Sequence, residues 1–246
     1  MFDKFLPKRK IGYLFPLSII DNVAYQFYHL VPEGIMLLML PIGLREFTPK
    51  DVERAFAPIE QYVSMLVEQD VDIIVQGGVP PALLMGIERH DALLERIKEA
   101  SGLPATSTIL NVVASARGLG IKKMVFANKW NPNMNRILGG FFAREGIEAA
   151  GTTSRSMVPD EFLKMKGGES LQLAYDLGCA ALKNNPNADG LYIGGSAWLT
   201  FPIVDVLEKE FGKPVITNAN ATVWHVCHLM DTWQPIAGCG RLLESP

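Results

Sequence analysis

The chain carries the same order of strand and helix signals twice, and this internal repeat constrains its fold more than any other feature. An apolar run ends in Gly77-Gly78 in the first half, and another ends in Gly194-Gly195 in the second. The separation between Gly12 and Gly78 in the first half is nearly the same as the separation between Val125 and Gly195 in the second half. This match predicts a duplicated α/β unit, although an α/β protein without duplication would also alternate strands and helices.

Each half is expected to form parallel strands with helices between them. The expected strands cover residues 11–16, 35–41, 71–76, 103–108, 122–127, 147–151, 188–193 and 213–218. The expected helices cover residues 48–69, 92–100, 131–145, 169–183 and 203–211, with one more ending near Gly118 and another following Asn218. The predicted fold class is α/β, with two pseudo-symmetric Rossmann-like lobes, each a mainly parallel sheet flanked by helices, and an active site in the cleft between them.

The repeat also predicts how the chain divides. Residues 1–118 are expected to form an N-terminal α/β lobe, and residues 119–219 a C-terminal α/β lobe. The segment from about 220 to 246 is expected to pack back on the N-terminal lobe. With 246 residues, of which 48% are hydrophobic and 20% charged, the chain can bury a core of this size.

Charge and hydropathy exclude several kinds of partner. The formal net charge is −3 and the triplet Lys8-Arg9-Lys10 is too short for a phosphate-binding tract, which argues against nucleic acid. No apolar run reaches the length of a membrane span, and the first residues do not resemble a secretory signal. We therefore expect a cytoplasmic protein without a membrane partner, and a homo-oligomer stays open.

The cysteines and histidines do not predict a metal site or a disulfide framework. Cys179, Cys227 and Cys239 lack the pairing that metal sites show. His225 and His228 could share one face of a helix, but no third ligand has suitable spacing. We therefore expect no metal, and we interpret the two histidines as packed or exposed side chains.

The two glycine turns are candidate anion sites. A parallel strand that ends in glycines before a helix can expose backbone N–H groups to a carboxylate or a developing oxyanion. On this interpretation Gly77, Gly78, Gly194 and Gly195 bind substrate together with the Ser196 hydroxyl. The alternative is a tight strand-to-helix connection that needs glycine for its backbone conformation or for close packing.

Other residues after strand ends are expected to border the same cleft. Pro16 ends the first strand, and Trp130 and Asn131 follow the corresponding strand of the second half, where a helix begins. Asn131 could equally be only a helix cap. The remaining candidates for substrate binding are Val79, Trp198 and Asn218.

These residues resemble the aspartate/glutamate racemase superfamily, and arylmalonate decarboxylases and maleate isomerases in particular. The similarity rests on the order and spacing of residues 11–16, the two glycine turns, the Gly-x-Pro strands at 102–104 and 212–214, and the tail Gly240-Arg241-Leu242-Leu243. It implies two α/β lobes, no metal and no organic cofactor, and carbon-acid chemistry on small carboxylates. It also implies one or two catalytic cysteines after the glycine-turn strands.

This chain has no cysteine at those positions. The first falls at Gly78, and the second at Gly195 or, with a shift of one residue, at Ile193. Racemisation and maleate-type isomerisation by a thiol are therefore not expected. The favoured prediction is a cofactor-independent lyase, a decarboxylase acting on a small carboxylate through an enediolate-like intermediate, with Ser196 as the catalytic residue. The alternatives are a hydratase, hydrolase or isomerase that uses activated water, and a carboxylate-binding protein without activity.

Overall fold

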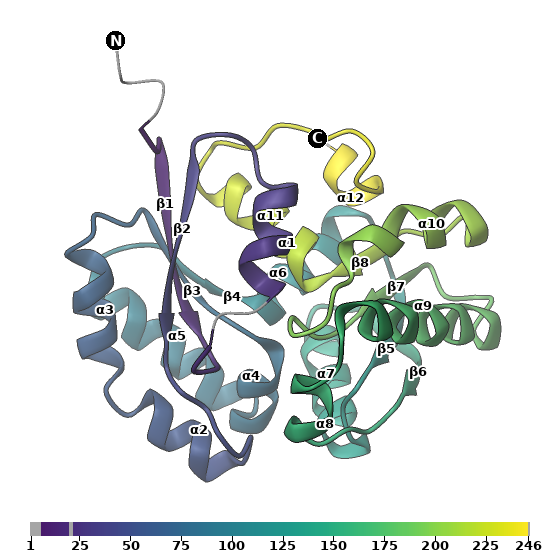
Figure 1. Cartoon of the computed structure of the whole chain (residues 1–246), viewed down its shortest axis with the longest axis horizontal. Helices are drawn as coiled ribbons and strands as arrows, with labels where there is room; N and C mark the ends of the chain where they lie inside the picture. Colours follow the sequence, from purple (N-terminus) through teal and green to yellow (C-terminus); the bar gives the residue numbers. More distant parts are fainter. Residues whose placement is uncertain (1–5, 20–21, 246) are drawn as a thin grey trace.

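The structure is a computed structural model that describes residues 6–19 and 22–245. It contains two four-stranded sheets in which every neighbouring pair of strands is parallel (Figure 1). The first has the order β2-β1-β3-β4 and the second the order β6-β5-β7-β8. Because the two halves have the same strand order, the predicted α/β fold with two matched lobes is confirmed.

The strands lie close to their predicted positions. They are β1 (Arg9–Phe15), β2 (Ile35–Pro41), β3 (Ile73–Gln76), β4 (Ala105–Ser107), β5 (Lys123–Asn128), β6 (Glu148–Ser154), β7 (Gly190–Ile193) and β8 (Val215–Thr217). The central strands β1, β3, β5 and β7 are almost wholly buried, as expected for parallel strands covered on both faces.

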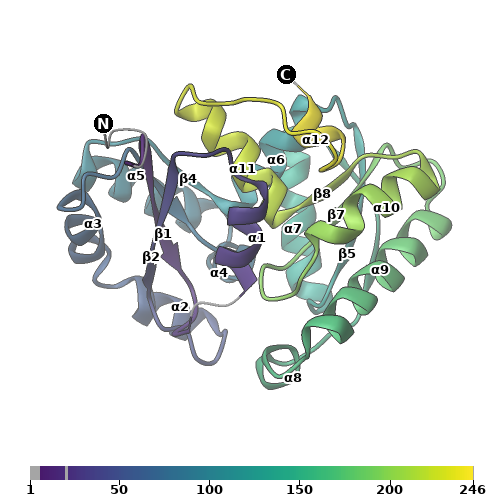
Figure 2. The same cartoon turned by 45° about the horizontal axis from the view of Figure 1, so that its top comes forward.

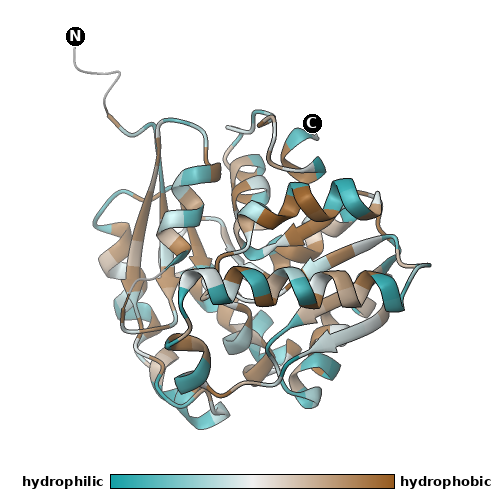
Figure 3. Cartoon of the chain, turned by 45° about the vertical axis from the view of Figure 1, so that its right-hand side comes forward, coloured by the Kyte–Doolittle hydropathy of each residue, from teal (hydrophilic) through white to brown (hydrophobic). Residues whose placement is uncertain are grey.

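Helices connect the strands and cover the sheets. The first half contains α1 (Asn22–Leu30), α2 (Pro49–Phe56), α3 (Ile59–Val67), α4 (Val79–Met85), α5 (Ile87–Ser101) and α6 (Thr108–Gly118). The second contains α7 (Pro132–Arg144), α8 (Pro159–Leu163), α9 (Gly167–Asn184), α10 (Phe201–Phe211), α11 (Asn218–Leu229) and α12 (Arg241–Glu244). Hydrophobic and hydrophilic segments alternate along them in Figure 3, which is typical of helices with one buried face.

The single helix predicted over residues 48–69 is wrong. Thr48 caps α2 as expected, because its hydroxyl accepts a 3.1 Å hydrogen bond from the Asp51 amide. The helix ends at Phe56, and α3 begins after Pro58. A proline inside a helix lacks the amide hydrogen and clashes with the preceding turn, so Pro58 divides the segment into two helices.

Helix α11 carries the C-terminal part of the chain to the first sheet. It packs on α6 and α1, between the two sheets (Figures 1 and 2). Val223 and Val226 of α11 belong to the same buried cluster as Ile11 and Phe15 of β1. These contacts support the predicted division of the chain, which stays a prediction. Within residues 6–19 and 22–245, no helix combines the length and apolar character that a membrane crossing requires.

Candidate active site

A cavity of about 230 Å³ lies where the carboxyl ends of strands from both sheets face each other. Ligands bind at such strand ends in open α/β sheets. The residues that line the cavity are Phe15, Pro16, Leu17, Glu46, Phe47, Gly78, Pro80, Lys129, Trp130, Asn131, Met134, Ser156, Met157, Val158, Phe162, Gly195, Ser196 and Ala197. Both halves of the chain therefore contribute to one site.

Six of the eleven predicted site residues line this cavity. They are Pro16, Gly78, Trp130, Asn131, Gly195 and Ser196. The structure places Gly77, Val79, Gly194, Trp198 and Asn218 outside its lining. Val79 and Trp198 are fully buried in two separate hydrophobic clusters, so neither reaches a ligand in the cavity directly. Trp198 instead packs against the side chain of Lys129, which lines the cavity.

The expectation that the first glycine of each turn offers a free amide is wrong. The Gly77 amide donates to the Leu14 carbonyl over 3.0 Å, and the Gly194 amide to the Ala127 carbonyl over 2.8 Å. Both bonds continue the ladder between neighbouring strands, because each glycine directly follows the last residue of its strand. Neither amide is available to an anion.

The second glycine of each turn bonds to a helix start in its own half. The Gly78 amide donates to the Thr108 hydroxyl over 3.0 Å, and the Gly195 amide donates over a long 3.5 Å to Oδ1 of Asn218. Thr108 and Asn218 are the first residues of α6 and α11. The turns are therefore matched in bonding as well as position.

Two amides that can still bind a ligand lie directly after the second glycine turn. In the part of the chain that the structure describes, the amides of Ser196 and Ala197 donate to no protein group. Both residues line the cavity. Two successive amides at a loop of this kind can bind a carboxylate or an oxyanion.

Ser196 is oriented by Asn218 from behind the cavity. The Asn218 side chain donates through Nδ2 to Oγ of Ser196 over 3.0 Å. Its Oδ1 accepts a 2.7 Å hydrogen bond from the Tyr192 hydroxyl, which fixes the amide orientation. Burial raises the pKa of Tyr192 well above its usual value, so this phenol stays a neutral donor. Since Ser196 accepts from Asn218, its own proton can be donated into the cavity.

Lys129 is the site residue that the sequence reasoning missed. It directly follows β5, only 5% of its surface is exposed, and it lines the cavity. Its Nζ lies 4.3 Å from the ring centroid of Trp198 and 5.2 Å from that of Phe162. An ammonium group at such a distance over an aromatic face is attracted to the ring. Its position after a central strand, at the same sheet edge as a glycine turn, was the available signal.

Aromatic residues from both halves close one side of the cavity. Phe47 comes from the loop before α2, and Phe162 comes from α8. Their rings meet edge to face with centroids 5.8 Å apart. Apart from Lys129 and the exposed Glu46, the lining contains no charged residue, so most of the wall is apolar.

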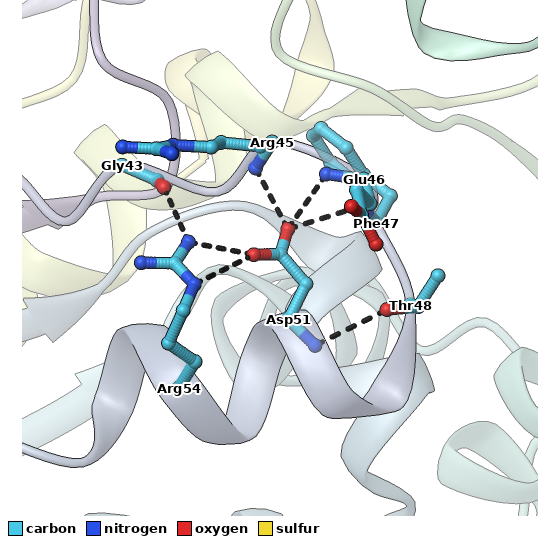
Figure 4. Close-up of polar contacts among 7 residues, drawn as sticks. All are labelled: Gly43, Arg45, Glu46, Phe47, Thr48, Asp51 and Arg54. Atoms are coloured by element: carbon cyan, nitrogen blue, oxygen red, sulfur yellow. Dashed lines mark hydrogen bonds and ion pairs between the residues drawn. The ribbon is translucent and has the colours of Figure 1, made fainter.

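Asp51 holds the loop that carries Glu46 and Phe47 (Figure 4). Its Oδ2 accepts hydrogen bonds from the amides of Arg45 and Glu46, at 2.7 Å each, and of Phe47 at 3.3 Å. Arg54 donates to Oδ1 over 2.6 Å. Burial acts to raise the pKa of Asp51, but the Arg54 guanidinium and the three amides outweigh it and lower the pKa to about 2.

The same loop contains a strained residue. Phe47 has φ of 53°, a conformation that a bulky side chain rarely adopts. The three amide bonds to Asp51 over-determine the backbone there. The aromatic wall of the cavity is therefore held in place by a buried ionised carboxylate.

The three cysteines lie outside the lining of the cavity. Cys179 and Cys227 are buried, and Cys239 is partly buried. Burial raises the pKa of Cys227 to about 11, so its thiol is not an activated nucleophile. Among residues 6–19 and 22–245, no three His, Cys, Asp or Glu side chains are arranged to hold a metal ion.

The two sheets with matched strand order agree with the two-lobe fold expected of the Asp/Glu racemase superfamily. The family model for arylmalonate decarboxylase matches residues 21–243, and the chain belongs to the arylmalonate decarboxylase family. The arylmalonate decarboxylase of Bordetella bronchiseptica is 24% identical over 204 residues, which cover 82% of this chain and 84% of that protein.

Solved structures share the whole fold. A glycine-to-cysteine, cysteine-to-serine double mutant of arylmalonate decarboxylase in its liganded form has a TM-score of 0.84 at 21% identity, covering 96% of this chain and 98% of the other. The maleate isomerase of Pseudomonas putida S16 has a TM-score of 0.85 at 16% identity, with the same coverage. A Nocardia farcinica maleate cis-trans isomerase mutant with a covalently bound succinylcysteine intermediate has 0.83 at 18%, covering 97% and 99%. At these identities the likeness shows the fold alone.

Proposed function

We propose that this chain is a cofactor-independent lyase that decarboxylates a small carboxylate through an enediolate-like intermediate, without a catalytic cysteine. The observation that carries this proposal is the composition of the cavity: one buried cation, one oriented hydroxyl and apolar walls, with no thiol in the lining. Membership of the arylmalonate decarboxylase family supports the reaction class.

The carboxylate that stays on the product binds at the polar end. The Lys129 ammonium and the amides of Ser196 and Ala197 supply positive charge and donors there. Their attraction grows as the carboxylate becomes an enediolate with more negative charge, so they stabilise the transition state more than the substrate.

The carboxylate that leaves faces the apolar wall. The side chains of Phe15, Leu17 and Met134 offer it no hydrogen bond, and this environment favours uncharged CO2 over a carboxylate. The carbon–carbon bond breaks, CO2 departs, and the electron pair remains as the enediolate. A proton from the Ser196 hydroxyl then forms the new carbon–hydrogen bond, and solvent restores the serine.

A substrate panel in deuterated water tests this proposal. Purified protein is incubated with aryl- and alkyl-substituted malonates, maleate and hydroxy acids, and NMR follows each compound. The proposal expects loss of one carboxylate and gain of one deuterium at the adjacent carbon. Conversion of maleate, or of a hydroxy acid, without CO2 loss would favour isomerisation or hydration through activated water. Ligand-induced thermal stabilisation without turnover of any compound would overturn the lyase and favour a binding protein.

A further inference from the structure

A second, smaller pocket lies directly behind Ser196, between α1 and α11. Its volume is about 20 Å³, and Ser196 lines both this pocket and the main cavity. The residues that line the small pocket are Tyr13, Val23, Gln26, Phe27, Leu37, Ser196, Asn218, Ala219 and Thr222. Ser196 is therefore the side chain that separates the substrate cavity from a space of molecular size.

This space fits one water molecule. A polar pocket needs roughly 10–15 Å³ of such volume and two to four hydrogen-bonding partners to hold a water. Asn218 gives one side-chain N–H to Ser196 and has a second to offer. Thr222 accepts a long 3.5 Å bond from Asn111, and its own hydroxyl proton is donated to no described protein group.

Gln26 also lines the pocket, but most of its hydrogen-bonding capacity is already used. Its Nε2 donates to the Trp198 carbonyl over 3.2 Å, and its Oε1 accepts from Thr200 and from the Phe201 amide. Its side chain is thus committed to the segment after the second glycine turn. Ser196, Asn218 and Thr222 line the pocket and keep hydrogen-bonding capacity, as does the second Nε2 hydrogen of Gln26.

We propose that a water molecule in the small pocket, held by Asn218 and Thr222, returns the proton to Ser196 after each turnover. This inference rests on the decarboxylation proposed above. As the Ser196 O–H bond breaks and the substrate C–H bond forms, Oγ takes a proton from the water. Val23 and Ala219, which line the pocket, are partly exposed, and exchange of the water with solvent is part of this proposal. The water that gives up this proton becomes hydroxide, which leaves the pocket and combines with the released CO2, so that in sum the substrate carboxylate and one water yield the protonated product and bicarbonate.

The water in the small pocket supplies the stabilisation that a serine hydroxyl needs in order to donate its proton. A thiol is acidic enough to give up its proton readily, whereas an alcohol does so only when its oxygen receives a proton or hydrogen bonds as the bond breaks. The Asn218 bond and the water together supply that stabilisation on the side away from the substrate. The proton path therefore reaches Ser196 from the small pocket, on the side away from the main cavity.

Substitutions in the small pocket test the path without touching the main cavity. Thr222→Val keeps the side-chain shape but removes the hydroxyl, and Ala219→Val fills the pocket. Each is expected to lower kcat about tenfold with KM unchanged and to alter the solvent deuterium isotope effect on kcat. Thr222→Ser is expected to restore most of the rate. Thr232→Val removes a hydroxyl that follows α11 and donates to the Cys227 carbonyl, and it serves as the matched control.

A crystal structure of the full chain decides the site independently of activity. The expected result is an ordered water within hydrogen-bonding distance of Ser196 Oγ and Thr222 Oγ1 that is lost in Ala219→Val. A dry pocket in the wild-type protein would overturn the inference, as would unchanged kcat and isotope effect in both valine variants. If no substrate is turned over, the decarboxylase proposal fails, while the crystal structure still decides whether the water site exists.

Discussion

The side-chain amide of Asn218 donates a 3.0 Å hydrogen bond to the hydroxyl of Ser196. Tyr192 holds the other end of that amide, so the direction of the bond is fixed. The three residues come from β7, the turn after it and the first position of α11. A loop serine beside an open cavity is thus oriented by a buried network, which is the condition for a positioned proton donor.

Asn218→Ala is expected to lower both activity and stability. The substitution frees the Ser196 hydroxyl to rotate and leaves the buried Tyr192 hydroxyl without its acceptor, at a cost of about 1–3 kcal/mol in the free energy of unfolding. Steady-state kinetics and denaturant unfolding measure the two effects. Asn133→Ala on the exposed face of α7 is the control. Wild-type kcat in Asn218→Ala would contradict the positioning role.

Lys129→Met is expected to weaken substrate binding. Methionine keeps much of the packing against Trp198 and Phe162 but removes the cation, and loss of one charged hydrogen bond predicts about ten- to hundredfold weaker binding. KM and ligand-induced thermal shifts measure this, with exposed Lys166→Met as the control. Lys129→Arg keeps the charge and should bind better than Lys129→Met. Equal affinity in all three proteins would remove Lys129 from the carboxylate site.

Asp51→Asn is expected to destabilise the protein in a pH-dependent way. Since folding lowers the pKa of Asp51 from 3.8 to about 2, its carboxylate stabilises the folded state above about pH 4, and this contribution is lost as the pH falls toward 2. The shift corresponds to about 2 kcal/mol at neutral pH. Urea unfolding at several pH values measures the difference from wild type, with exposed Asp176→Asn as the control. A difference that does not shrink between pH 4 and pH 2 would refute this account.

Gly195→Ala is expected to destabilise the second glycine turn. Gly195 has φ of 126°, and an added Cβ would lie 2.8 Å from Nε1 of the buried Trp198. Forcing alanine into this conformation costs about 1–3 kcal/mol. Gly168→Ala, where an added Cβ meets nothing within 4 Å, is the control and should be neutral or slightly stabilising. Similar melting temperatures for the two variants would show that the turn can relax.

The sequence was sufficient to predict the lobes because their signals are local. Each buried strand is a short apolar run, and the paired glycines and Gly-x-Pro segments mark the strand order. The break at Pro58 is an equally local signal, because a proline inside a helix removes an amide hydrogen and clashes with the preceding turn. The hydrogen bonds of the glycine turns could not be predicted, because Gly78 bonds to Thr108, thirty positions further along the chain.

The candidate site was predicted only where strand ends mark it. Pro16, Gly78, Trp130 and Ser196 lie within three residues of the ends of central strands, so their place at the cleft follows from the topology. Phe162 lies in a short helix far from any such strand end, and only the folded chain brings it to Phe47. Lys129 was available to the same reasoning, but a lysine in sequence is usually a solvated side chain.

The most direct test of the central claim compares the loss of the Ser196 hydroxyl with the loss of all three cysteine thiols. Decarboxylation in deuterated water is followed by NMR for the wild-type protein, for Ser196→Ala, and for a triple variant with Cys179, Cys227 and Cys239 changed to alanine. The account predicts that the triple variant retains turnover and deuterium incorporation within about twofold, while Ser196→Ala loses about a hundredfold or more in kcat. Full activity in Ser196→Ala, or its loss in a folded triple variant, would contradict it.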